Sequence, residues 1–285
     1  MLGRALQRRS IYIWRDIPYT DKAHPRQMLD VVVPTAPTFP RAKLPVTVFV
    51  HGGAWQRGDK NGPFYAHVAR TIAQSTSTLA VTMNYRLSPE VMYPEHIRDV
   101  LHALQWVHRE IHKFGGDNER IVLMGHSAGA HSVIKLALDD GIDFPNCPQL
   151  TGVIGISGVY NIVRLSTASI FGSMALDPVF GVGVQARREA SVLQPFAGGS
   201  RRLGTKAHLP ILLLYAQDDF HLDDDALEVK AWLDSVGFTN VTSQEIPRVN
   251  HFSIIGNVTP DLPMSPSTEA ISKFIRDTTT QPRCH

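Results

Sequence analysis

A serine between two glycines is the most chemically suggestive feature of this sequence. Residues 125–129 read Gly-His-Ser-Ala-Gly and fit the pattern G-x-S-x-G around Ser127. An apolar run at 121–124 precedes the motif, as a short buried strand would, and helix-forming residues follow at 130–138. A strand, a sharp turn and a helix would hold the serine in a strained conformation with its Oγ exposed. The pattern therefore predicts that Ser127 is a nucleophile.

A serine hydroxyl attacks only when a base takes its proton, and that base needs a third group to hold it in the right tautomer. Both partners are expected on loops that follow later strands. His251 is the only histidine between the last predicted strand, 241–246, and the last predicted helix, 269–275. We therefore expect His251 to be the base.

Two neighbouring carboxylates compete for the third role. Asp218 and Asp219 both follow the strand predicted at 211–215. The deeper position in the loop favours Asp219, and Asp218 would then cap the loop or be exposed. The residues alone leave both assignments open.

Attack on a carbonyl places negative charge on its oxygen, and backbone N–H groups aimed at that oxygen usually give the largest electrostatic stabilisation. Ala128 opens the predicted helix after the serine, and a His-Gly-Gly-Ala segment follows an earlier predicted strand. We expect His51 to hold this segment by hydrogen bonds. The expected oxyanion hole comprises the amides of Gly52, Gly53, Ala54 and Ala128.

The elements that must position these groups alternate between strands and helices. Strands are predicted at 28–33, 46–50, 79–84, 121–124, 152–156, 211–215 and 241–246, and helices at 64–73, 94–111, 130–138, 224–236 and 269–275. Such alternation implies βαβ crossovers and a mostly parallel central sheet with helices on both faces. The irregular stretch at about 160–209 reads as a small cap inserted into a single α/β domain that spans 1–285.

Composition excludes several classes of function. The chain has 285 residues, and its net charge of +2 is too small to indicate a nucleic-acid partner. It has no apolar run of the length of a membrane span. We expect Cys147 and Cys284 to be free thiols, which favours a cytoplasmic location. The arginines within 1–10 read as a solvated terminus, and organelle targeting is left open.

Two further patterns resemble metal sites only superficially. His108 and His112 have the i, i+4 spacing of zinc ligands, but the intervening glutamate is not in the H-E-x-x-H position and no third ligand is evident. The acidic run 223–225 does not have the spacing of a calcium loop and suits the start of a helix. We therefore expect neither a metal nor another cofactor.

Six segments together resemble the α/β-hydrolase fold, and more narrowly its branch with an HGGxW loop. They are HGGAW (51–55), NYRLSPE (84–90), GGDNERIVLMGHSAGAH (115–131), ISGVYNI (156–162), AQDD (216–219) and NHFSII (250–255). That branch contains kynurenine formamidases, small feruloyl or acetyl esterases and prenylcysteine methylesterases. The resemblance implies that Gly53 and Ala54 form the oxyanion hole and that the acid is Asp219. The hormone-sensitive-lipase-like branch fits less well, because this chain has His126 and Ala130 in its motif and a short strand-like N-terminus.

The leading prediction is a serine hydrolase that cleaves small carboxylic esters through an acyl-enzyme on Ser127. An arylformamidase that hydrolyses N-formylkynurenine with the same residues is the alternative, and a non-catalytic binding protein on this fold is a minor one. The expected partner is a small ester or formamide, and a homodimer is compatible with the sequence. The predicted substrate-binding residues are Trp55, Tyr65, His126, Tyr160, Phe171, Met174 and Phe252.

Overall fold

The computed structural model describes residues 11–22, 24–34, 42–139, 145–168, 172–193, 204–261 and 263–280. Within them, eight strands form one sheet in the order β1-β2-β4-β3-β5-β6-β7-β8. The strands are β1 (Tyr12–Pro18), β2 (Met28–Val33), β3 (Leu44–Val50), β4 (Leu79–Met83), β5 (Gly116–His126), β6 (Gly152–Ile156), β7 (Ile211–Asp218) and β8 (Val241–Asn250). Strand β2 runs antiparallel to both β1 and β4, and all pairs from β4 to β8 are parallel. The expected mostly parallel sheet is confirmed.

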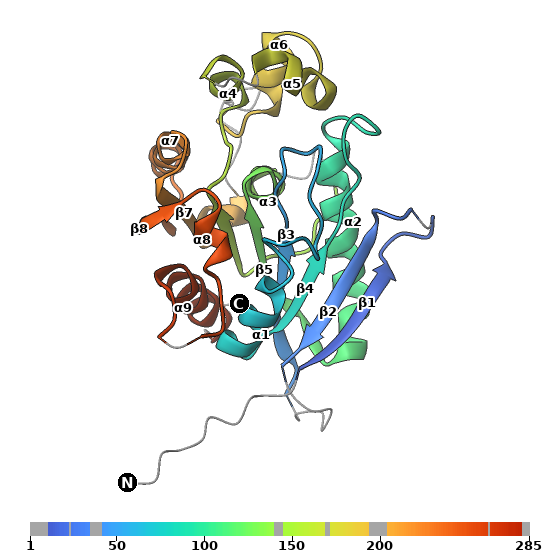
Figure 1. Cartoon of the computed structure of the whole chain (residues 1–285). Coiled ribbons are helices and arrows are strands. Elements are labelled where there is room, and N and C mark those ends of the chain that lie inside the picture. Colours follow the sequence, from blue (N-terminus) through green and yellow to red (C-terminus); the bar gives the residue numbers. More distant parts are fainter. Residues whose placement is uncertain are drawn as a thin grey trace.

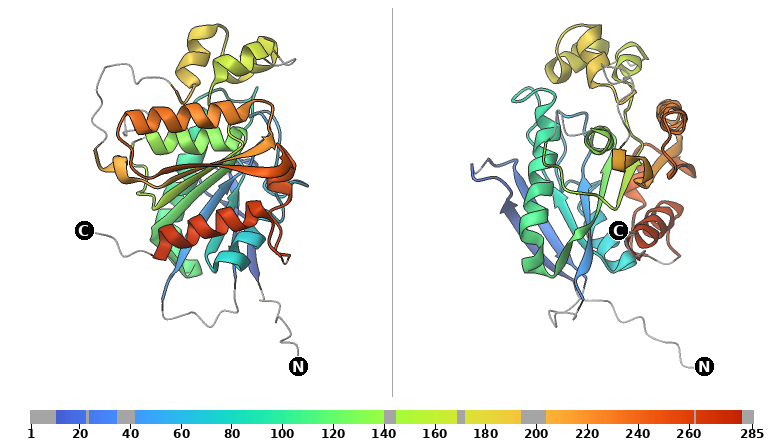
Figure 2. Two further views of the ribbon diagram at one scale, coloured as in Figure 1. Left: turned by 90° about the vertical axis from the view of Figure 1, so that its left-hand side faces the viewer. Right: turned by 180° about the vertical axis from the view of Figure 1, so that it is seen from behind.

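Helices cover both faces of this sheet, as the alternating pattern predicted. Helices α2 (Glu95–Glu110), α3 (Ala128–Leu138) and α7 (Leu222–Ser235) pack on one face, and α1 (Val68–Thr76) and α9 (Pro266–Thr280) pack on the other. The edge-on view in Figure 2 (left) shows α3 and α7 on one side of the sheet and α1 and α9 on the opposite side. Three short elements, η1 (Ile111–Phe114), η2 (Gly204–His208) and α8 (Ser253–Gly256), complete the connections.

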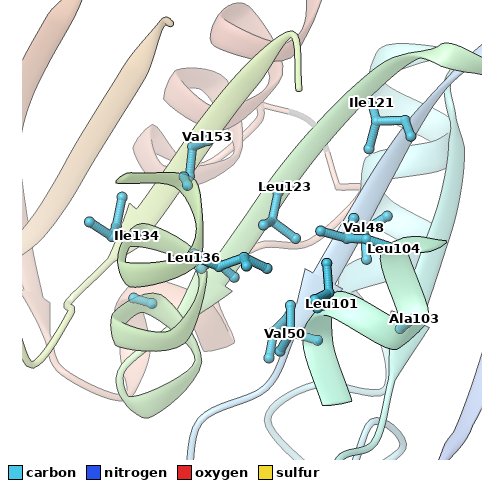
Figure 3. Packing of buried hydrophobic residues seen from close by; sticks show 14 of the residues in the cluster. Val48, Val50, Leu101, Ala103, Leu104, Ile121, Leu123, Ile134, Leu136 and Val153 are labelled. Atoms are coloured by element: carbon cyan, nitrogen blue, oxygen red, sulfur yellow. The ribbon is translucent and has the colours of Figure 1, made fainter. Parts of the chain in front are cut away.

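Alternation along the central strands divides the core between the two faces. In β3, Val48 and Val50 point toward α2 and α3, whereas Phe49 joins the cluster under α1 and α9. Figure 3 shows Val48 and Val50 packed beside Leu101 and Leu104 of α2. Each such side chain stabilises the fold by roughly 1.5–3 kcal/mol relative to its exposed state. The carboxyl ends of these strands are therefore rigid supports for the loops that follow them.

Element boundaries differ from the sequence predictions at a few places. Strand β5 begins at Gly116 rather than at Ile121 because Gly116 pairs with Leu44, while the polar residues 117–120 hide this start from an apolar pattern. Helix α1 begins at Val68 rather than at position 64, since turns occupy the preceding residues. Strand β1 pairs with β2 as an edge strand and gives a defined place to the strand-like N-terminal stretch.

Three short helices lie apart from the sheet, at the top of Figure 1. They are α4 (Ile162–Ala168), α5 (Gly172–Phe180) and α6 (Val184–Ala190), and they contain most of the described part of the predicted insertion. The amide of Tyr93 donates to Val179 O (2.7 Å), and the Gln56 side chain donates to Ala175 O (3.0 Å). These bonds fasten α5 to the loops after β3 and β4.

Asp225 at the start of α7 anchors the beginning of this insertion. Its buried carboxylate accepts hydrogen bonds from the amides of Tyr160 (2.8 Å) and Asn161 (2.7 Å) and pairs with Arg164 (2.6 Å). The acidic run is indeed at a helix start, but one of its members also joins two distant segments. Sequence spacing gave no sign of that contact.

Candidate active site

Ser127 occupies a sharp turn between β5 and α3. Strand β5 ends at His126 and α3 begins at Ala128, so the serine is the single connecting residue. Its backbone has φ 55° and ψ −120°, a conformation that costs a non-glycine residue on the order of 1–3 kcal/mol. The Ser127 amide donates to Ile156 O of β6 (2.9 Å), which holds the strained turn against the neighbouring strand.

Three glycines allow the backbone to close around this turn. A Cβ on Gly125 would lie 2.4 Å from Gly129 O, and a Cβ on Gly129 would lie 2.4 Å from Val50 O. A Cβ on Gly52 would lie 2.9 Å from the Cβ of Ser127. The glycines of G-x-S-x-G are therefore required by close backbone approaches, and the Gly-Gly loop after β3 packs directly against the serine.

The structure brings Ser127, His251 and Asp219 into one hydrogen-bonded line. His251 Nδ1 lies 2.7 Å from Asp219 Oδ1, and His251 Nε2 lies 3.1 Å from Ser127 Oγ. Because the carboxylate only accepts, Nδ1 carries the proton and Nε2 is left to accept the serine hydroxyl. This is the geometry that a serine needs in order to lose its proton to a base.

Asp219 is held from its other side by two donors. Its Oδ2 accepts the hydroxyl proton of Ser157 (2.6 Å) and the amide proton of Ala216 (2.9 Å), and its side chain is fully buried. Asp218 is exposed, and its carbonyl oxygen accepts the His251 amide (3.2 Å). Of the two neighbouring acids, the structure brings Asp219 to the imidazole, whereas Asp218 contributes only its backbone.

Ser157 is a member of this site that the sequence reasoning did not identify. It follows β6 directly, is fully buried, and has φ 47°. Its place at the carboxyl end of a central parallel strand was the available signal, because such ends gather at one edge of the sheet. A serine in a Ser-Gly pair is too common for that position alone to indicate a role.

The loop after β3 has an unusual backbone conformation. Gly53, Ala54 and Trp55 have φ values of 125°, 53° and 60°, three consecutive positive values. A Cβ on Gly53 would lie 2.1 Å from Arg57 O, so the loop folds tightly back on itself. The amide of Ala128, at the first position of α3, has no partner within the helix. The loop that begins at Gly52 and the start of α3 thus both adjoin Ser127.

Gly52 differs from the other expected donors. The Tyr65 hydroxyl oxygen would lie 2.8 Å from a Cβ on Gly52, and burial raises the pKa of Tyr65 to about 12. Gly52 is therefore packed against the Tyr65 hydroxyl, whereas the positive φ values of the loop begin at Gly53.

His51 is hydrogen-bonded to the loop after β3, as the sequence predicted. Its Nδ1 donates to Gly52 O (2.7 Å), and its ring stacks on Tyr85 at a centroid distance of 4.5 Å. The Arg26 guanidinium lies 3.4 Å from Nε2. Burial lowers the pKa of His51 to about 4, so the ring remains neutral near pH 7.

His126 and Tyr65 form a buried hydrogen-bond chain rather than the walls of a pocket. Tyr65 Oη donates to His126 Nδ1 (2.9 Å), and His126 Nε2 donates to His251 O (2.9 Å). Both side chains are more than nine-tenths buried, and burial holds the pKa of His126 well below its usual range. Their assignment as substrate-binding residues is corrected accordingly, because their polar atoms already bind one another and the backbone.

Three other predicted pocket residues also lie elsewhere. Trp55 is 1% exposed and packs edge-on against His131 and Phe180, and Tyr160 is fully buried. Met174 is 85% exposed, so its side chain faces solvent from α5. Aromatic and sulfur-containing side chains near the motifs were expected to line the site. Of these three, Trp55 and Tyr160 are buried in the protein interior and Met174 is exposed on the surface. Phe171 lies outside the described residues.

Phe252 is the predicted pocket residue that does lie beside His251. Its ring is 50% exposed and stands edge-on to the His251 imidazole at a centroid distance of 5.3 Å. Phe220, which the sequence reasoning missed, is 68% exposed and lies 5.6 Å from the same imidazole. Its position next to Asp219 was the only signal.

No group of three or more His, Cys, Asp or Glu side chains within the described ranges could hold a metal ion. His108 Nδ1 donates instead to Asn118 O (3.2 Å). Across the same ranges no helix has both the length and the apolar character needed to cross a bilayer. Cys147 is a free thiol, and Cys284 lies outside the described residues.

Comparisons with known proteins agree with this architecture. A family model described as BD-FAE matches residues 29–170. Esterase LipC of Mycobacterium tuberculosis is 34% identical over 174 residues, which are 57% of this chain and 41% of that protein. "Probable isoprenylcysteine alpha-carbonyl methylesterase ICMEL1" of Arabidopsis thaliana is 28% identical over 229 residues, 76% of this chain and 46% of that protein. The chain thus spans less than half the length of these curated relatives.

The chain also resembles solved structures. The crystal structure of esterase B from Lactobacillus rhamnosis superposes with a TM-score of 0.75 at 23% sequence identity and covers 94% of this chain and 85% of that one. A truncated carbohydrate esterase from gut microbiota superposes with a TM-score of 0.73 at 16% identity, covering 98% of this chain and all of that one. At such identities the likeness concerns the fold.

Proposed function

The chain belongs to the α/β-hydrolase superfamily, and from that premise we propose that it is a serine hydrolase that cleaves small carboxylic esters. The observation that carries the proposal is the line from Ser127 Oγ through His251 to Asp219, with separations of 3.1 and 2.7 Å. Names of curated relatives, such as Esterase LipC and Carboxylesterase NlhH of Mycobacterium tuberculosis, support the same class of substrate.

The proposed reaction has two steps. Ser127 Oγ attacks the ester carbonyl while His251 Nε2 takes the hydroxyl proton, and the carbonyl oxygen becomes negatively charged toward the amides of Gly53, Ala54 and Ala128. The bond to the alcohol oxygen then breaks, that oxygen takes the proton from His251, and an acyl group remains on Ser127. In the second step His251 takes a proton from water, the hydroxide attacks the acyl-enzyme, and Ser127 regains its proton as the acid leaves.

Labelling with a fluorophosphonate tests the proposal, because the reagent traps an activated serine. We expect the wild-type chain to be labelled at Ser127 and to hydrolyse p-nitrophenyl acetate. Ser127→Ala should abolish labelling and lower kcat by roughly 10⁴–10⁶. An unreactive Ser127 would favour the third possibility, a binding protein that uses the fold without catalysis.

An arylformamidase is the second candidate, and one observation favours it. The exposed rings of Phe220 and Phe252 flank His251, where a departing aromatic amine would receive its proton. Comparison of kcat/KM on p-nitrophenyl acetate and on N-formylkynurenine separates the candidates. A preference of orders of magnitude for the formamide would replace the ester as the substrate.

The remaining organisation is also proposed. We infer a single domain from 1 to 285 in which the helices at about 160–209 cap the site, supported by the packing of Phe180 against Trp55 beside Ala128. We further propose a cytoplasmic location, consistent with the free thiol of Cys147. Sedimentation of the purified chain would test the homodimer that the sequence allows.

A further inference from the structure

Resting on the proposed function, we propose that Phe220 and Phe252 receive the leaving group of the substrate, and that this group is an aromatic or other flat apolar alcohol. We call these two rings and the neighbouring Phe64 the aromatic ledge. The ring centroid of Phe252 lies 5.7 Å from that of Phe64 and 6.2 Å from that of Phe220, so the three rings form one surface. The contacts of Ser127, His251 and Asp219 alone do not specify this substrate class.

The chemistry of the reaction determines which part of a substrate meets the ledge. The leaving oxygen must lie within about 3 Å of His251 Nε2 to take its proton. The acyl carbon is bonded to Ser127, and its oxygen points toward the amides of Gly53 and Ala54. Groups attached to the leaving oxygen therefore lie next to the imidazole, where Phe220 and Phe252 are 5.6 and 5.3 Å away.

The exposure of these rings indicates that they are available to a ligand. Phe220 and Phe252 are 68% and 50% exposed, and Phe64 is nearly half exposed, although each ring has a large apolar surface. Contiguous exposed apolar side chains beside a reaction centre are typical of a binding surface. An aromatic leaving group would cover them and exclude water from the imidazole edge.

The backbone holds Phe220 in this place at a cost. Phe220 and His221 have φ values of 54° and 65°, the left-handed region that bulky side chains rarely adopt. The turn follows Asp219 directly, and α8, which begins after Phe252, lies beside the ends of β7 and β8 (Figure 1). Strain of this kind persists where the surrounding structure requires it, and here it places an aromatic ring at the base.

The test compares two acetates whose alcohols have similar acidity but different shapes, 2-naphthyl acetate and hexafluoroisopropyl acetate. Both form the same acetyl-enzyme, so differences in kcat/KM report acylation and the leaving group alone. We expect Phe220→Ala and Phe252→Ala each to lower kcat/KM for the naphthyl ester by about fivefold, the effect of one aromatic pair. The fluoroalkyl ester should change by less than about twofold. Phe220→Leu should fall between Ala and wild type.

Trp14→Ala is the matched control. Trp14 is an aromatic residue of β1 that is 43% exposed, and β1 lies at the opposite edge of the sheet from β8. Its loss should leave the ratio of the two esters unchanged.

Two results would overturn the inference. Equal losses on both esters would mean that the rings only position His251, and no loss on either ester would mean that the leaving group does not touch them. A wild-type chain that hydrolyses neither ester and whose Ser127 resists fluorophosphonate would instead remove the proposed function, and this inference with it.

Discussion

Replacing Asp219 by asparagine should slow the reaction strongly, because it would move the ring proton of His251 to the wrong nitrogen. In the structure Asp219 Oδ2 accepts hydrogen bonds from Ser157 Oγ and the Ala216 amide, at 2.6 and 2.9 Å. These two donors would bind the oxygen of an asparagine side chain, so the NH₂ group would face His251 Nδ1. Nδ1 would then have to accept, and the ring proton would move to Nε2, where it blocks deprotonation of Ser127.

The expected loss in kcat is on the order of 10⁴, equivalent to about 5.5 kcal/mol at the transition state. Hydrolysis of p-nitrophenyl acetate measures it, and urea unfolding checks that the variant is folded. Asp218→Asn is the control, since Asp218 is exposed and uses only its carbonyl toward His251; it should stay within a few fold of wild type. A larger loss in Asp218→Asn, or less than a tenfold loss in Asp219→Asn, would refute the reasoning.

Three other perturbations follow from the same contacts. Ser157→Ala removes a hydrogen bond to a buried carboxylate and should lower kcat about tenfold with little change in KM. His126→Leu leaves Tyr65 Oη and the His251 carbonyl without their partner, and should lower the free energy of unfolding by roughly 2–4 kcal/mol in urea. Four buried histidines bind a proton in the unfolded chain below pH about 6.5 but not in the folded one, so acid should destabilise the fold as the pH falls from about 6.5 toward 4, with each histidine contributing at most about 1.4 kcal/mol per pH unit. They are His51, His96 and His131, whose pKa values burial lowers to about 4, 4 and 3, and His126, whose pKa burial holds well below its usual range. Equal stability at pH 6.5 and 4.5 would contradict this.

Sequence patterns were sufficient wherever a side chain's role depends on its neighbours along the chain. The G-x-S-x-G turn, the His-Gly-Gly loop and the predicted strands depend on local spacing, and the structure places them as expected. The choice between Asp218 and Asp219 was harder, because it depends on which of the two side chains turns inward. Ser157 was missed since its partner is 62 residues away.

The predicted pocket failed for a related reason. An aromatic residue beside a motif can pack in the core or contact a ligand, and its residue type does not show which of the two it does. Trp55 is buried by the helices of the insertion, which come from more than a hundred residues later. Phe220 is exposed at a left-handed backbone position, a conformation that no pattern of apolar residues predicts.

The residue before the nucleophile shows how strongly the interior restricts a position that the motif leaves free. His126 must accept a hydrogen bond from Tyr65 and donate one to the His251 carbonyl, with the two partners on different sides of its ring. A neutral imidazole has one donor and one acceptor separated in this way, whereas lysine only donates and a carboxylate only accepts. Burial keeps the pKa of His126 well below its usual range, so the neutral form is the one present. The backbone of the proposed base is thereby hydrogen-bonded to the residue that precedes the proposed nucleophile, and Gly52 packs against the Tyr65 hydroxyl. The loops after β3, β5 and β8 are thus linked through His126 and its partner Tyr65.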